Sequence, residues 1–185
     1  MTFTTSSEQS GAAPAKSGSE YHLVQKLGTA VVASEWKYLR TLLVEIKTER
    51  FNEVMDNLKD EGITHLSTII GLESDRGIEI LYPFFTNVKD SEKADKLMIK
   101  VILPKEKPEI DSLVSRFWGA QFYEREVFDI LGVNFRGHPN LERLIMPDIM
   151  PMGVHPLLKK WTPEQLQEML EEAQRQAEEK GRHGW

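Results

Sequence analysis

The sequence contains no cysteine, and this absence removes several classes of site at once. Without thiolates, the chain cannot form disulfides, ligate an iron–sulfur cluster through cysteine, build a cysteine zinc site or use a cysteine nucleophile. The absence is compatible with a reducing compartment. The 185 residues suit one domain with tails, and a body of this size buries a core without cross-links.

Basic charge and long apolar runs are also scarce. The formal net charge is −6, which argues against nucleic-acid binding because phosphate contacts need clustered Lys and Arg. No apolar run approaches the roughly 20 residues that a membrane span requires. The N-terminus lacks a basic region followed by an apolar block, which argues against a secretory signal. These features predict a soluble cytoplasmic protein.

The distribution of apolar and polar residues along the chain predicts one α+β domain between two tails. Residues 1–19 offer too little apolar surface to offset the entropy of ordering, so we expect a disordered tail. Residues 20–132 form the predicted domain, which opens on a short helix at residues 20–27. An extended arm is predicted over residues 133–161, and an amphipathic helix over residues 162–185.

Runs of apolar or alternating residues predict the strands of this domain. They span residues 38–47, 64–73, 78–85 and 96–104. After the first strand, Thr48 caps a predicted helix that ends at Gly62. Its apolar stripe consists of Phe51, Val54, Met55 and Leu58. Pro83 indicates an edge or strand-end position, and residues 107–132 look helical in two pieces. The sum is a mostly antiparallel four-stranded sheet with helices packed on one face.

The predicted arm is irregular but too apolar for a solvated linker. Its prolines are Pro139, Pro147, Pro151 and Pro156. An irregular stretch of this length is typical of a functional or partner-binding segment, and a proline-rich arm loses little entropy when it docks. Met146, Met150 and Met152 suit a surface that moulds to a partner. Alternatively, these methionines fold back into the domain's own core.

The terminal helix begins with a capping-box pattern. Thr162 stands at the N-cap, Pro163 at the first helical position and Gln165 two residues later. A narrow apolar stripe follows at Leu166, Met169, Leu170, Ala173 and Ala177. The stripe fits either a solvated helix packed on its own domain or a helix lying on a partner.

The stretch from residue 122 to residue 148 holds the densest group of chemically active side chains. Glu124, Arg125, Glu126 and Asp129 fall within one and a half turns of a predicted helix. Two carboxylates this close are candidates for general acid–base catalysis. Arg125 and Asp129, at i and i+4, are equally suited to a charge pair, and the spacing favours the charge pair.

His138 and His155 are the candidate metal ligands, and each precedes a proline. No HxH, HExxH or CxxC motif accompanies them. The alternative is that each histidine is held extended by its proline and makes a structural hydrogen bond. Glycine-rich phosphate loops and the GxSxG motif are also missing, so the sequence shows no self-contained catalytic apparatus.

The stretch "FWGAQFYEREVFDILGVNFRGHPNLERLIMPD" resembles the signature of the C (30-kDa) subunit of respiratory complex I. The positions that fit it are Glu124, Arg125, Glu126, Phe128, Asp129, Gly132, Phe135, Gly137, His138, Pro139, Leu141 and Arg143. The resemblance covers about residues 38–160. The sequence departs from the family pattern at Glu142 and in "GVHPLLKKW", where Leu158 and Trp161 replace an Arg and an Asp. These departures favour a relative, such as a membrane-bound [NiFe] hydrogenase or a sulfane sulfur reductase.

The resemblance implies a non-catalytic scaffold subunit in the peripheral arm of a membrane redox complex that couples electron transfer to ion translocation. It implies no cofactor or metal on this chain, with iron–sulfur clusters, and [NiFe], flavin or quinone, on partner subunits. The implied partners are a large subunit with the quinone or active-site cavity, a small iron–sulfur subunit and other peripheral-arm subunits. The implied location is the cytoplasmic side of the membrane. The chain is expected to have no membrane span of its own and to bind no nucleic acid.

We expect the four charged residues of the predicted helix to form fixed ion pairs, within the domain or across an interface, and residues 133–160 to run over the partner. The residues assigned to the interface or the motif are Glu124, Arg125, Glu126, Asp129, Gly137, His138, Pro139, Arg143, Pro147, Asp148, Gly153, His155 and Pro156. Two other hypotheses stay open. One is a free-standing hydrolase using Glu124, Glu126, Asp129 and His138, and the other is a small binding module that acts alone.

Overall fold

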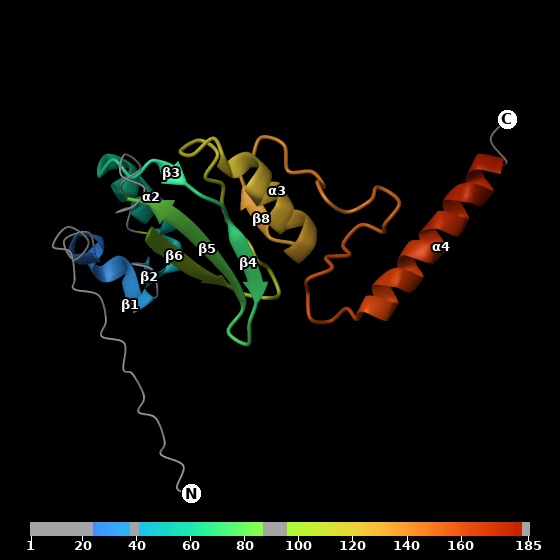
Figure 1. Cartoon of the computed structure of the whole chain (residues 1–185), viewed down its shortest axis with the longest axis horizontal. Helices are drawn as coiled ribbons and strands as arrows, with labels where there is room; N and C mark the ends of the chain where they lie inside the picture. The colour runs from blue at the N-terminus through green and yellow to red at the C-terminus, as the bar shows by residue number, and fades with distance from the viewer. Residues whose placement is uncertain (1–23, 38–40, 87–95, 183–185) are drawn as a thin grey trace, which may run out of the picture.

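A six-stranded sheet forms the centre of the structure, a computed structural model that describes residues 24–37, 41–86 and 96–182 (Figure 1). Its strands are β1 (Val31–Lys37), β2 (Thr41–Ile46), β3 (His65–Leu66), β4 (Ile70–Glu73), β5 (Ile78–Phe85) and β6 (Lys96–Leu103). The order is β1-β2-β6-β5, and the far side of β5 pairs with both β3 and β4. Only β2 and β6 run parallel among these pairs.

The other elements flank this sheet. They are η1 (Gly28–Ala30), η2 (Thr48–Arg50), α2 (Phe51–Asp60), β7 (Glu109–Asp111), α3 (Ala120–Leu131), β8 (Asn134–Arg136) and α4 (Pro163–Arg182). The predicted tail at residues 1–19 and most of the predicted helix at 20–27 lie outside the described residues; residues 24–27 are helical.

The core lies between the sheet and the helices α2 and α3. The alternation in β5 and β6 buries one face, as predicted, at Ile78, Ile80, Tyr82, Phe84, Leu97, Ile99, Val101 and Leu103. The predicted stripe of α2 is buried as well, and its Phe51 ring lies 5.1 Å from the ring of Tyr82. At Gly71 of β4, a Cβ would lie 2.5 Å from Leu131 of α3. Both helices therefore pack on the same face, which confirms the α+β layers.

The prediction of four strands was wrong, because the sheet has six. Strand β1 was missed because most of its residues are exposed, so it lacks the apolar alternation that marks a strand. The predicted strand at residues 64–73 is divided into β3 and β4. Pro83 lies inside β5 rather than at an edge or end, opposite this interruption, where the Ser67 N–H donates to the Pro83 carbonyl at 2.8 Å. In an antiparallel strand, the N–H and the carbonyl of one residue point to the same side. The nitrogen of Pro83, which carries no hydrogen, therefore faces the interruption between β3 and β4, where the ladder does not require a donor.

Two helix predictions also need correction. Residues 109–111 form β7 rather than helix, because they pair in parallel with β8, a partner distant in sequence, and bury Ile110 against Phe135. Helix α3 begins only at Ala120. It ends before Gly132, as predicted, and Gly132 itself adopts the left-handed conformation. Thr48 does not cap α2; it opens η2, and its hydroxyl donates to the Ile102 carbonyl at 3.1 Å.

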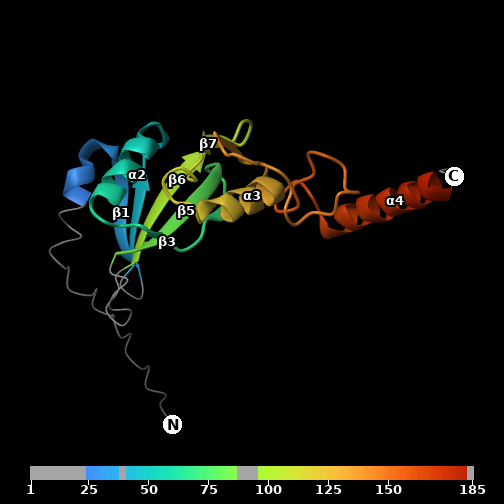
Figure 2. The same cartoon turned by 90° about the horizontal axis from the view of Figure 1, so that it is seen from above.

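Helix α4 extends away from the sheet in both views (Figures 1 and 2). Its capping box is confirmed: the Thr162 N–H donates to Gln165 Oε1 at 2.9 Å, and the Gln165 N–H donates to the Thr162 hydroxyl at 3.3 Å. No helix among the described residues, α4 included, is both long enough and apolar enough to cross a bilayer. Residues 137–161 connect β8 to α4 without a helix or strand of their own. We call residues 137–161 the connecting segment.

Candidate partner-binding surface

Glu124 is fully buried on α3 and holds the segment before that helix in place. Its carboxylate accepts hydrogen bonds from the Ser112 hydroxyl and the Leu113 N–H, both at 2.6 Å. Burial raises the pKa of Glu124 to about 7, and these two hydrogen bonds oppose the rise only in part. The nearby Tyr82 hydroxyl is buried without a hydrogen-bond partner among the described residues. Burial first, and the Glu124 charge second, raise the pKa of Tyr82 well above its ordinary value.

Arg125 binds the backbone of the connecting segment. Its guanidinium donates to the Glu142 carbonyl at 3.1 Å and to the Arg143 carbonyl at 2.8 Å. The predicted charge pair between Arg125 and Asp129 is therefore not formed in the described part of the chain. Two consecutive carbonyls suit the two-pronged guanidinium donor, and this is a contact that charge spacing along one helix does not reveal.

Asp129 binds the same segment from the acceptor side. One carboxylate oxygen accepts from three consecutive backbone N–H groups, those of Leu144 at 3.0 Å and of Ile145 and Met146 at 2.7 Å. Burial acts to raise the pKa of Asp129, but the three N–H groups and the nearby Arg143 outweigh it and lower the pKa below its ordinary value. Asp129 is thus a buried, ionised anchor for the connecting segment.

Arg143 closes the next part of the segment on itself. It lies 3.9 Å from Asp129, and it donates to the carbonyls of Met150 at 2.7 Å and Pro151 at 2.6 Å. The pair of Asp129 and Arg143 is an ion pair inside the chain, between α3 and the segment. Hydrogen bonds from charged side chains to the backbone therefore fix residues 142–151 onto α3.

The two histidines make structural hydrogen bonds. His138 Nδ1 accepts from the Asn140 N–H, so its Nε2–H donates to the Gln121 carbonyl, both at 3.0 Å. His155 Nδ1 lies 2.9 Å from the Asp129 carbonyl at the end of α3. Its ring fills the space beside Gly132, where a Cβ would lie 2.7 Å away. Within the described ranges, no three His, Asp or Glu side chains converge in a way that could hold a metal.

The remaining predicted residues have simpler environments. Glu126 and Pro156 are half-buried, and Pro139, Pro147 and Asp148 are exposed. Gly137 and Gly153 adopt positive φ angles of 80° and 81°, which favour glycine. Glu124, Glu126, Asp129 and His138, the residues of the hydrolase hypothesis, are not brought together; Glu124, Asp129 and His138 are bonded to three separate parts of the backbone.

The sequence did not reveal how many large apolar side chains this region exposes. We call them the apolar cluster: Trp118, Phe122, Leu144, Ile145, Ile149, Met152 and Leu157. Trp118 is 75% exposed and Met152 is 80% exposed, whereas Met150 is buried and Met146 half-buried. The methionines therefore divide between the chain's own packing and the surface. Helical periodicity identifies only the inward face of α3, and turns have no period that would show which side chains point outward.

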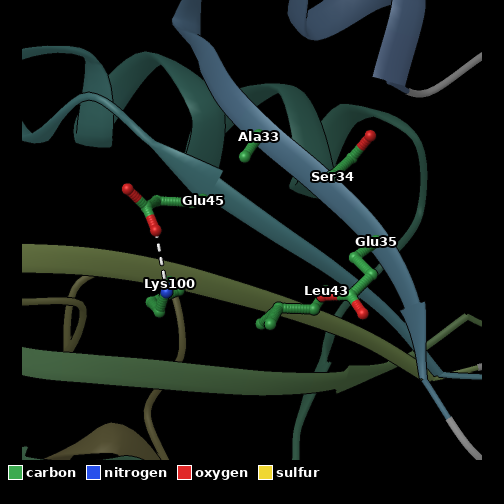
Figure 3. A pocket seen from close by; sticks show the side chains of 6 residues that line it. All are labelled: Ala33, Ser34, Glu35, Leu43, Glu45 and Lys100. Carbon is green, nitrogen blue, oxygen red and sulfur yellow. Dashed lines mark ion pairs between the residues drawn. The ribbon is translucent and has the colours of Figure 1, made fainter.

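The uncovered face of the sheet is a second possible surface, with a shallow hollow lined by β1, β2 and β6 (Figure 3). Its charges are satisfied internally. Lys100 lies 2.7 Å from Glu45, and Arg76 donates to the same carboxylate at 2.5 Å and 2.9 Å. The hydrogen bond from Arg76 is the largest of the influences that lower the pKa of Glu45. The hollow thus offers little unpaired charge to a ligand.

Known proteins resemble the chain over the region that contains α3 and the connecting segment. Residues 44–167 match the family described as "Respiratory-chain NADH dehydrogenase, 30 Kd subunit". The C subunit of F(420)H(2) dehydrogenase from Methanosarcina mazei is 32% identical over 117 residues, which are 63% of this chain and 72% of that protein. Subunit 5 of NADH-quinone oxidoreductase from Thermus thermophilus is 30% identical over 132 residues, which are 66% of this chain but 62% of that protein, less than two thirds of its length.

Two solved structures share the fold. A trypsin-resistant fragment of Nqo5 superposes with a TM-score of 0.58 and 28% identity, covering 66% of this chain and 98% of the fragment. A chain of the membrane-bound sulfane sulfur reductase, an archaeal respiratory membrane complex, superposes with a TM-score of 0.63 and 22% identity, covering 78% of this chain and 84% of that one.

Proposed function

Because the chain belongs to the family of the 30 Kd subunit of respiratory-chain NADH dehydrogenase, we propose that it is a non-catalytic scaffold subunit in the peripheral arm of a membrane redox complex. Its relatives are subunits of oxidoreductases with different electron donors, F(420)H(2) in one and NADH in another. The difference in donors supports a structural role for this subunit, with the donor bound by other subunits.

One observation carries this proposal: five members of the apolar cluster, Leu144, Ile145, Ile149, Met152 and Leu157, stand on a segment that is already fixed. Several large apolar side chains left exposed on one short segment are typical of a protein interface. Arg125, Asp129 and Arg143 hold the backbone of residues 142–151 in this segment by hydrogen bonds. A surface ordered before binding loses less conformational entropy when a partner docks.

The chemistry of the site supports a scaffold rather than a catalyst. Glu124, Asp129 and His138 have their polar atoms engaged by neighbouring backbone or hydroxyl groups, so they are not poised toward a substrate. The redox groups are assigned to partners: iron–sulfur clusters, with [NiFe], flavin or quinone according to the complex. The partners are the large subunit with the quinone or active-site cavity and the small iron–sulfur subunit, on the cytoplasmic side of the membrane.

A membrane-bound [NiFe] hydrogenase or sulfane sulfur reductase is the alternative host complex. Leu158 and Trp161 favour it, because the complex I pattern has Arg and Asp at these positions. Leu158 packs against the core, and the buried Trp161 indole N–H has no partner among the described residues.

A matched pair of substitutions tests the proposal. Ile145→Asp puts a charge in the apolar cluster, and Val32→Asp puts the same charge on β1 at nearly equal exposure, 55% against 54%. The full chain carries an affinity tag, and the complex is purified from membranes. We expect Ile145→Asp to lose the partner subunits while Val32→Asp retains them, with both free chains folded. Retention of every partner subunit by both variants would refute the assignment.

A further inference from the structure

Helix α4 lies largely beyond the part of the chain that the family shares. The family match ends at residue 167, whereas the helix continues to Arg182. The helix extends away from the sheet (Figure 2), and most side chains of its residues 163–179 are exposed. It is therefore an addition to the common body rather than a part of its core.

A groove runs between this helix and the connecting segment. Ile149 and Pro151 form one wall, and Met169 and Ala173 of α4 form the other with Glu172 and Gln176. Its apolar residues include the exposed Ile149 and the half-buried Met169. The groove is thus open to solvent and of mixed character, with Ile149, Met169 and Ala173 beside the polar Glu172 and Gln176.

The helix carries more acidic than basic residues. Residues 163–182 contain six glutamates against three basic residues, Arg175, Lys180 and Arg182, and the two glutamates nearest the groove precede all three. Glu168 and Glu172 lie one turn apart on the same side, and neither forms an ion pair among the described residues. Like charges at this spacing destabilise a helix slightly, so a cation between them would be stabilising. The surface disfavours anionic lipid and nucleic acid, which would be repelled, and a second copy of an equally acidic helix.

We propose that this groove binds a basic amphipathic segment of a neighbouring subunit, with an apolar side chain between Ile149 and Met169 and a Lys or Arg beside Glu172. The inference rests on the proposed function, because the neighbour is a subunit of the same complex. The groove is then a second docking site, separate from the apolar cluster. Relatives that share only the matched region would lack this site.

The cysteine-free chain allows a specific test. A single cysteine carrying a photoactivated benzophenone is placed at Gln176→Cys in the groove and at Gln167→Cys, which is two and a half turns away on the opposite side of α4. Phe122→Cys reports separately on the apolar cluster. Each tagged full chain is irradiated within the membrane complex, and the cross-linked peptides are identified.

We expect Gln176→Cys to cross-link a partner peptide that combines apolar residues with Lys or Arg, and Gln167→Cys not to cross-link it. Equal cross-linking at both positions, none at Gln176→Cys, or a product with a second copy of this chain overturns the inference. If Phe122→Cys still cross-links a partner, only the α4 inference fails. If neither position does, the proposed function fails with it.

Charge reversal supplies the matched second test. Glu172 and Glu171 each accept a hydrogen bond from a glutamine one turn away, at 3.2 Å and 3.0 Å, but only Glu172 lines the groove. Glu172→Lys should lower the yield of the Gln176→Cys cross-link by about fivefold or more, and Glu171→Lys should leave it unchanged. An equal effect of both reversals, or no effect of either, contradicts the proposed basic partner.

Discussion

The sheet body and the connecting segment are stabilised by different interactions. In the body, buried side chains from β5, β6 and α2 form one apolar core. In the segment, Arg125, Asp129 and Arg143 hold a turn-rich backbone through hydrogen bonds to its N–H and carbonyl groups. The body therefore depends on apolar burial, whereas the segment combines the burial of a few side chains, such as Met150 and Val154, with hydrogen bonds from charged side chains. The exposed apolar side chains of the segment, such as Ile145 and Met152, are therefore not needed to hold it.

The largest expected effect breaks the body. Phe84 is buried and its ring lies 5.2 Å from Phe117, whereas the next residue, Phe85, is half-buried on the uncovered face of the sheet. Phe84→Ala should lower the free energy of unfolding by about 3–5 kcal/mol because it opens a cavity in the core. Phe85→Ala should cost roughly 1–2 kcal/mol. Chemical denaturation of the full chain measures both, and equal losses would show that the two faces are packed alike.

The next effect concerns pH and the buried carboxyl of Glu124. Its pKa of about 7 in the folded chain lies above its ordinary value of 4.5, so the folded state binds the proton more tightly. The resulting cost is absent at pH values below 4.5 and grows as the pH rises toward 7. Between about pH 5 and pH 8, the wild type should lose about 2–3 kcal/mol more than Glu124→Gln. Denaturation at the two pH values measures this difference, and parallel curves would contradict it.

Asp129 should respond in the opposite sense and in the other region. Its lowered pKa means that its contribution is present above the unfolded pKa and is lost as the pH falls through the lower folded value. Asp129→Ala removes the acceptor of three N–H groups and should free the segment locally, at a cost of about 2 kcal/mol.

The hydrogen-exchange rates of the Leu144, Ile145 and Met146 amides should rise in Asp129→Ala. The amides of β5 should still exchange only through global unfolding of the chain. Asp148→Ala, which changes an exposed carboxylate of the same segment, serves as the control and should change neither. Uniform acceleration across the sheet and the segment would mean that the two regions are not separable.

The smallest expected effect tests geometry rather than charge. Arg143→Lys keeps the positive charge beside Asp129 but cannot reach the Met150 and Pro151 carbonyls with the same planar donor pair. We expect a loss of about 1 kcal/mol, seen as faster exchange in residues 147–151. Unchanged exchange there would show that charge alone holds this part of the segment.

The same contrast explains what the sequence could predict. Apolar alternation identified the inward residues of β5 and β6, and capping rules identified Thr162 and Gln165, because these signals are local. Strand β1 is too exposed to alternate, and β7 depends on pairing with β8. The partners of Arg125 and Asp129 are backbone atoms of residues 142–146, which carry no side-chain pattern. The family motif therefore located the site, but only the fold shows what its charged residues bind.

The central claim is that the apolar cluster is covered by a partner subunit in the assembled complex. Hydroxyl-radical footprinting tests it most directly, because Trp118 and Met152 are both highly exposed in the free chain and lie at different places in the cluster. The oxidation rates of these two side chains should fall severalfold from the free full chain to the purified complex. Equal rates in both states would contradict the claim.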